Sequence, residues 1–228
     1  MPRAVKALAC SFAVLSLASG RQAAASSFAI DVGSPGGTIH HVVPALSEIS
    51  PGVFIGSVDF TESGAFALHM DLHLEGDPMI MGSFSLTNLG AITQTFSVSA
   101  TMGGAPVPGP TLMSGSFGDV TYTDLNNNRI VMLVASPFYQ AQIDGVGVQN
   151  LGALNVGPLS GVVPKQSFGS VPGPGVATSI GVAFPGFSLT AGDQVQTPFE
   201  FTVVVPEPST GPLLALGLAG LLVVTRRR

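Results

Sequence analysis

Residues 69–75 read His-Met-Asp-Leu-His-Leu-Glu, a strict alternation of polar and apolar side chains. Successive side chains of an extended strand point to opposite faces, so Met70, Leu72 and Leu74 share one face and the polar residues share the other. Such an alternation is typical of a strand with one face in a core and the other in solvent. The stretch predicts a half-buried β-strand, which we expect to run from residue 65 to residue 75.

Short alternating runs recur along the chain between breaks of Gly, Pro and Asn. The strands expected besides 65–75 are 53–60, 80–87, 91–100, 111–123, 129–135, 138–143, 176–184 and 198–205. Loops at 88–90 and 126–128 suggest two hairpins, the first with Ile92, Phe96 and Val98 on one face. Four prolines between residues 145 and 175 predict a long irregular excursion there.

This pattern predicts an all-β fold, an antiparallel β-sandwich of about eight to ten strands. Charged residues make up only 9% of the chain, fewer than helices exposed to water normally carry. One domain, residues 26–205, is the expectation at this length.

The charge of that domain limits its partners. Between residues 26 and 205 only Arg129 and Lys165 are basic, against twelve carboxylates, which gives a formal charge of −10. Affinity for nucleic acid comes from basic residues that displace counterions from phosphates, so nucleic acid is excluded as a partner class. The composition suits contact with neutral glycans or divalent cations.

The N-terminal segment predicts a secretory signal peptide over residues 1–25. Arg3 and Lys6 precede an apolar stretch, and Ala23-Ala24-Ala25 offers a cleavage site before Ser26. Cys10, the only cysteine of the chain, lies inside this segment, and most of the apolar stretch follows it, unlike in a lipoprotein signal. The mature domain is therefore expected to contain neither disulfide nor thiolate.

The C-terminal tail, residues 206–228, combines three elements in order. Pro206, Glu207 and Pro208 come first, an apolar run over 213–224 follows, and Arg226, Arg227 and Arg228 end the chain. The run is shorter than the ~20 apolar residues of a comfortable spanning helix, but a thinned bilayer and snorkelling arginines would accommodate it. The arginines would stay on the cytoplasmic side as a membrane stop and leave the tripeptide outside.

This order of tripeptide, short apolar run and terminal arginines resembles the PEP-CTERM sorting domain of exopolysaccharide-producing Gram-negative bacteria. The resemblance implies that a membrane-embedded exosortase recognises the tail, cleaves near the tripeptide and releases or transfers the protein. Pro206, Glu207 and Pro208 would then be the sorting motif. The partners implied are the secretion translocon, the exosortase and exopolysaccharide, with transient residence in the inner membrane before the cell surface. The alternative is an ordinary C-terminal anchor that stays in place.

Two groups of residues are candidate metal ligands. His69, Asp71, His73 and Glu75 share one face of a strand, where adjacent members lie ~7 Å apart and could hold a metal such as zinc. The other interpretation is a solvated strand face, and His40 and His41 are the only further histidines that could complete such a site.

Asp124, Asn126 and Asn128 place oxygen ligands at alternate positions, as the first half of a calcium loop does. A complete loop would carry Gly and Glu where this chain has Arg129 and Ala135. A plain turn is therefore the preferred interpretation of this stretch, with calcium as the alternative.

No catalytic motif stands out in the sequence. No serine lies in a Gly-x-Ser-x-Gly elbow, the histidines suggest no base with an orienting acid, and tryptophan is absent. We therefore expect a non-enzymatic, exported surface or matrix protein without a cofactor. A secreted calcium- or glycan-binding module is the alternative.

Overall fold

The computed structural model describes residues 28–33, 39–76, 78–104, 106–127, 137–154 and 160–206, which form strands and no helix. The strands are β1 (Phe28–Gly33), β2 (Ile39–Val42), β3 (Ala45–Ser50), β4 (Val53–Glu62), β5 (Phe66–Glu75), β6 (Met79–Asn88), β7 (Gln94–Gly103), β8 (Thr111–Phe117), β9 (Val120–Thr123), β10 (Tyr139–Ile143), β11 (Val146–Leu151), β12 (Gly161–Val163), β13 (Gln166–Gly173), β14 (Ser179–Leu189) and β15 (Gln194–Val204).

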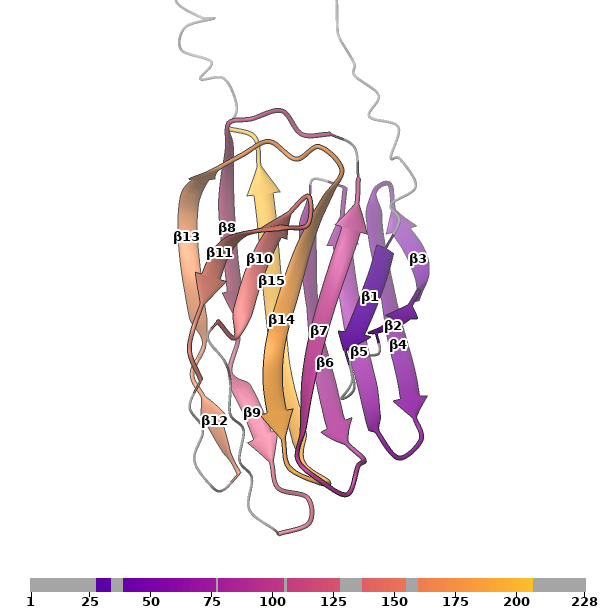
Figure 1. Ribbon diagram of the computed structural model, residues 1–228. Helices are drawn as coiled ribbons and strands as arrows, with labels where there is room; N and C mark the ends of the chain where they lie inside the picture. The colour runs from indigo at the N-terminus through magenta and orange to yellow at the C-terminus, as the bar shows by residue number, and fades with distance from the viewer. Residues whose placement is uncertain are drawn as a thin grey trace, which may run out of the picture.

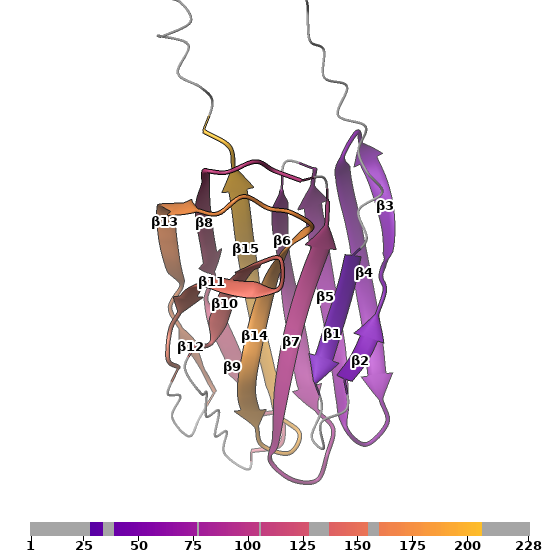
Figure 2. The same cartoon turned by 45° about the horizontal axis from the view of Figure 1, so that its top comes forward.

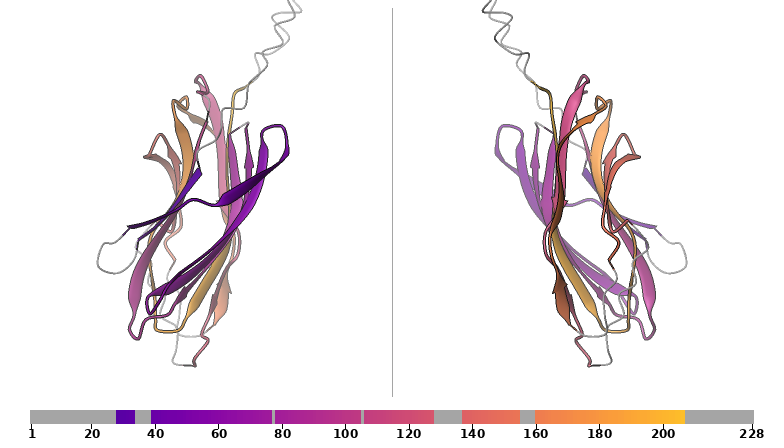
Figure 3. Two further views of the ribbon diagram at one scale, coloured as in Figure 1. Left: turned by 90° about the vertical axis from the view of Figure 1, so that its right-hand side faces the viewer. Right: turned by 90° about the vertical axis from the view of Figure 1, so that its left-hand side faces the viewer.

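Two antiparallel sheets pack face to face, as Figure 1 shows. The first has six strands in the order β11-β10-β14-β7-β1-β2. The second has nine strands, with β12-β9-β15-β6-β5-β4-β3 as its main path, with β8 beside β15 and with β13 beside β8. The two layers are separate when viewed from the side (Figure 3). The predicted all-β sandwich is thus confirmed, and β5 is the alternating strand expected from residues 69–75.

The predicted hairpin between residues 80 and 100 is wrong. β6 pairs with β5 and β15 in one sheet, whereas β7 pairs with β1 and β14 in the other. Asn88, fully buried, holds this crossing: its amide nitrogen donates to the carbonyls of Ile92 at 2.9 Å and Leu189 at 2.8 Å, and its amide oxygen accepts from Gly90 at 2.8 Å. Ile92 lies outside β7 and is 69% exposed, so it does not share the face of Phe96.

The expected strand 111–123 is interrupted, because its neighbour β15 contains a proline. Pro198 has no N–H to donate, and β8 ends and β9 begins opposite it. Gly118 fills the break and donates its N–H to the carbonyl of Pro198 at 2.8 Å. A Cβ at Gly118 would lie 2.4 Å from the ring of Pro198, so the break needs a glycine.

The region 145–175 is not the irregular excursion that its prolines suggested. Its described residues contain β11, β12 and β13, and Pro172 lies within β13, which pairs with β8 alone among the described strands. An edge strand tolerates proline because one side of its backbone needs no ladder partner. These three strands and β1, β2 and β3 are additional to the expected ones. The described residues therefore form fifteen strands, more than the expected eight to ten.

Aromatic rings fill the space between the sheets. Phe184 of β14 contacts four of them, with ring centroids 4.8 Å from Phe84, 5.2 Å from Phe138, 5.7 Å from Phe199 and 5.9 Å from Tyr139. Phe84 and Phe199 belong to the nine-stranded sheet, so these edge-to-face contacts join the two layers. Most of the buried side chains are apolar.

β1 begins and β15 ends toward the same end of the sandwich, which is the upper end in Figures 1 and 2. The predicted signal peptide (1–25), the strand 129–135 and the apolar run 213–224 lie outside the described residues. Within the part of the chain that the structure describes, no helix is long and apolar enough to cross a membrane.

Candidate functional site

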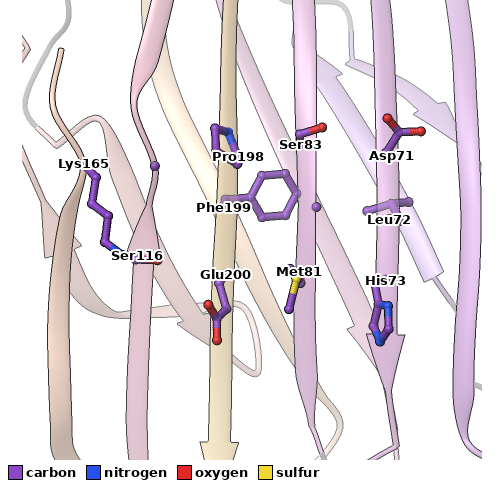
Figure 4. A pocket seen from close by; sticks show the side chains of 12 residues that line it. Asp71, Leu72, His73, Met81, Ser83, Ser116, Lys165, Pro198, Phe199 and Glu200 are labelled. Carbon is purple, nitrogen blue, oxygen red and sulfur yellow. The ribbon is translucent and has the colours of Figure 1, made fainter. Parts of the chain in front are cut away.

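A shallow cleft of about 460 Å³ lies on the outer face of the nine-stranded sheet. Figure 4 shows its side chains, which come from β5, β6, β15 and β8 and from the break between β12 and β13. It is lined by Asp71, Leu72, His73, Met81, Gly82, Ser83, Ser116, Gly118, Lys165, Pro198, Phe199 and Glu200.

The strand register builds the cleft as two parallel rows. In the first row His73 lies opposite Met81, Met81 opposite Glu200, and Glu200 opposite Ser116. In the second, Asp71 lies opposite Ser83 and Ser83 opposite Pro198. Neighbouring strands are about 4.8 Å apart, so adjacent side chains within a row are spaced by about that distance.

The chemistry of the cleft is mixed. Asp71 and Glu200 supply carboxylates, Lys165 an ammonium group, and Ser83 and Ser116 hydroxyls, while Met81, 39% exposed, and Pro198 add apolar surface. Lys165 is the one lysine or arginine of the described ranges. The backbone N–H of Lys165 donates to Asp119 Oδ1 at 2.9 Å. This bond ties the β12–β13 break to the side chain of a residue in the β8–β9 break.

The predicted face of His69, Asp71, His73 and Glu75 exists, but its side chains pair with one another. His69 Nδ1 lies 2.8 Å from Asp59 Oδ1 on β4, and His69 Nε2 lies 3.3 Å from Asp71 Oδ2. Hydrogen bonding to Asp59 raises the pKa of His69 above its ordinary value of 6.5, although partial burial lowers it and Asp71 raises it further. Both ring nitrogens of His69 thus contact carboxylates. This arrangement favours a solvated, ion-paired strand face over a metal site.

The other histidines do not converge with His69 on one site. His73 Nε2 lies 3.1 Å from Glu75 Oε1, His40 Nε2 lies 3.0 Å from Glu62 Oε2, and His41 contacts Asp31 on the other sheet. Across the residues that the structure describes, no three His, Cys, Asp or Glu side chains are grouped so that they could hold a metal ion.

Of the predicted calcium ligands, Asp124 and Asn126 lie in a turn that follows β9, at the end of the sandwich opposite the end of β15. Asn126 donates its N–H to Asp124 Oδ1 at 3.2 Å, and its amide nitrogen donates to Ala191 at 2.5 Å, so the stretch ties β9 to the β14–β15 connection. Asn128 lies outside the described residues.

Sequence reasoning missed a second carboxylate in this turn region. Asp193 is completely buried, and burial together with the charge of Asp124 raises its pKa to about 6. Asp193 lies in the connection between β14 and β15. No local sequence motif indicates that this connection buries a carboxylate.

Of the predicted sorting residues, the structure describes Pro206, which is exposed, while Glu207, Pro208 and Arg226, Arg227 and Arg228 lie outside the described residues. β15 continues to Val204, so only Val205 separates the fold from Pro206. Glu200, Ser116 and Lys165 were not predicted as site residues, because only the strand order brings them together.

Comparison with known proteins identifies the tail. A family model described as the PEP-CTERM protein-sorting motif matches residues 204–228, at the C-terminus. No curated protein matches this chain. The motif implies an exported protein that is sorted through the membrane to the cell surface and processed by an exosortase, which is a membrane enzyme.

Proposed function

We propose that this chain, which ends in a PEP-CTERM protein-sorting motif, is a non-enzymatic protein of the cell surface or extracellular polymer matrix with a structural or adhesive role. The observation that carries the proposal is the motif itself, fused to the last strand of a β-sandwich. The apolar run places the tail in the inner membrane transiently, and the arginines hold the tripeptide at the outer membrane face until the exosortase acts.

The solvent-facing positions of both sheets support a role among glycans. On β6 they carry Ser83, Ser85 and Thr87, and on β7 Thr95, Ser97, Ser99 and Thr101. Two of these side chains bond across strands: Thr95 Oγ1 lies 2.8 Å from Ser188 Oγ, and Thr87 Oγ1 accepts from Gln194 Nε2 at 3.1 Å. Short hydroxyl groups exchange hydrogen bonds readily with water and with sugar hydroxyls, and they carry no charge that would repel an anionic polymer.

The sorting role is tested in the native cell. Replacement of Glu207 by Ala, or deletion of residues 226–228, is expected to leave full-length protein in the inner-membrane fraction, because the enzyme loses its recognition motif or the motif loses its membrane stop. Glu200→Ala is the matched control, because it removes a carboxylate from β15, the strand that precedes the motif, and this variant should be processed normally. Unchanged gel mobility and surface yield for the Glu207 and deletion variants would refute the proposal.

The cleft favours a second candidate, a glycan-binding module. Asp71 and Glu200 can each accept hydrogen bonds from adjacent sugar hydroxyls, Lys165 and the serines can donate, and Met81 and Pro198 can pack against sugar C–H groups. A volume of about 460 Å³ falls within the range of small-molecule sites. The excess of carboxylates favours a neutral oligosaccharide over an acidic one.

Isothermal titration of the secreted protein with cellotetraose, maltotetraose and calcium separates the two candidates. Saturable heats for either sugar that disappear in Glu200→Gln and persist in Gln142→Ala, on the opposite sheet, would support the glycan-binding module. Calcium heats that disappear in Asp193→Asn would instead support calcium binding at the Asp124 turn. Flat titrations would leave the structural role.

A further inference from the structure

The last strand is held to the sheet almost to the point where the sorting motif begins. β15 pairs with β6 up to Thr202, opposite Met79, and with β8 up to Val204, opposite Leu112. The N–H of Val203 donates to the carbonyl of Pro78 at 2.9 Å, and the Val203 side chain is completely buried. Residues up to Val203 therefore cannot leave the sheet without exposing core.

The partner strand at this point is itself held on its other side. Leu112 lies opposite Pro172 of β13, so β8 is flanked by β15 and β13 at the level of Val204. Thr111 Oγ1 donates to the carbonyl of Pro174 at 2.6 Å, which closes the same end. The end of the ladder is thus supported by three adjacent strands.

The sorting motif begins at Val204, the last residue of β15, so no spacer separates fold and motif. Val205 and Pro206 are exposed and follow the ladder directly. An enzyme that cleaves a peptide binds it as an extended chain in a cleft, and backbone groups already engaged in a ladder are not available to that cleft.

We propose that the fold sets the N-terminal limit of exosortase cleavage: the scissile bond lies on the carboxyl side of Val205, and β15 stays paired with β8 while the bond is cut. The inference rests on the proposed sorting function and deepens it by locating the modification site. Cleavage breaks one peptide C–N bond. Water supplies the oxygen of the new carboxyl group, and the tail leaves with the nitrogen as its new amino group.

Mass spectrometry of the mature protein from its native cell reads the C-terminal residue directly. A terminus at Val205 or further along the chain supports the proposal, and a terminus at Val204 or earlier overturns it. An additional group on the terminal carboxyl would show an acceptor other than water without moving the limit. Recovery of only full-length protein would refute the sorting function itself, and the two failures are therefore distinguishable.

A crosslink tests whether the ladder stays closed. Leu112 and Val204 lie directly opposite each other, so Leu112→Cys with Val204→Cys suits a disulfide, and Cys10 is the only other cysteine of the chain. The control crosslink, Thr95→Cys with Ser188→Cys, joins opposed residues at the far end of the other sheet. We expect both crosslinked proteins to be processed to the same terminus as the parent.

Loss of processing in the Leu112/Val204 crosslink alone would overturn the closed ladder, because it would show that the strand end must open. If both crosslinked proteins fail to mature, the same comparison is made with Leu112→Ala, which loosens the ladder without a crosslink. Faster processing of Leu112→Ala than of the parent would then overturn the proposal, and an unchanged rate would support it.

Discussion

Tyr139 of β10 donates a hydrogen bond from its hydroxyl to the backbone carbonyl of Glu200 on β15 at 2.7 Å, and so joins the two sheets through the core. Burial, reinforced by the charge of Glu200, raises the pKa of Tyr139 well above its ordinary value. The hydroxyl therefore stays protonated and remains a donor throughout the physiological range. The same residue of β15 thus has its side chain in the cleft and its backbone bonded to the other sheet.

Replacing Tyr139 by Phe removes this donor and leaves the Glu200 carbonyl without its partner in the core. We expect a loss of about 1–3 kcal/mol in the free energy of unfolding, measured by urea denaturation of the secreted protein. Tyr122→Phe, in the half-buried β9, is the control and should cost less. Equal losses for the two variants would contradict the role of the inter-sheet bond.

Asp144 accepts hydrogen bonds from the N–H groups of Ala177, Thr178 and Ser179, at 2.9, 2.7 and 2.9 Å. Burial of this carboxyl opposes ionisation, but these bonds outweigh it and lower the pKa of Asp144 to about 2. Because the folded-state pKa is depressed, the stabilisation is complete above about pH 4 and is lost as the pH falls toward 2.

Asp144→Asn should therefore lower the melting temperature at pH 6, and its difference from the parent should shrink as the pH falls from 4 to 2. Thermal unfolding followed by circular dichroism measures both. Asp119→Asn, at a carboxylate that accepts one backbone N–H in place of three, is the comparison and should show a smaller effect. A pH-independent difference for Asp144→Asn would contradict the assignment.

Asp193 should have the opposite pH dependence. Its pKa is raised to about 6 by burial and by Asp124, so the folded state binds a proton more readily than the unfolded state. Stability from this group is present at about pH 4 and is lost as the pH rises through 6. Asp124→Asn removes the repulsion, so it should stabilise the protein at pH 8 and have no such effect at pH 4. Equal effects at the two pH values in urea denaturation would rule this out.

His69 should keep its proton at a pH where an ordinary histidine has lost it, because Asp59 and Asp71 face its two ring nitrogens. Titration of the ring proton signals by NMR measures this pKa directly. We expect Asp59→Asn to lower the pKa more than Asp71→Asn does, since the hydrogen bond to Asp59 contributes most to the shift. The reverse order would show that the pairing is wrong.

Gly82 lies beneath the cleft, where β6 has no room for a side chain. A Cβ there would lie 2.4 Å from the carbonyl oxygen of Asp71 and 2.9 Å from the ring of Phe199. Gly82→Ala should cost about 1–3 kcal/mol in the free energy of unfolding, by overpacking the core. Gly104→Ala, whose new Cβ would have no neighbour within 4 Å, is the matched control and should be close to neutral in urea denaturation.

Local patterns predicted the individual strands better than the way in which they pair. β4, β5 and β6 follow from alternation, because one face of each is buried against the core. The loop at Asn88 showed where β6 ends, but a short loop does not specify whether the next strand joins the same sheet. The cleft could not be predicted for the same reason, since Glu200 meets Ser116 and Met81 only through strand order.

Prolines misled the interpretation of the stretch from 145 to 175. Prolines argue against central strands, yet Pro172 lies in an edge strand and Pro164 in the break between β12 and β13. The tail is recognisable from the sequence, because its three elements follow one another along the chain and need no tertiary contact to be identified.

The border of the nine-stranded sheet next to β9 and β8 is broken between β12 and β13, which affects how neighbouring molecules can associate. An uninterrupted border strand offers its free N–H and C=O groups to any neighbouring chain that can add to it. Here the border is divided between β12 and β13, and Pro164 and Pro172 remove two of its donors. Where many copies are delivered to one place, a second molecule can therefore add a strand only along short lengths of this border. The border thus resists the growth of fibrils by strand addition.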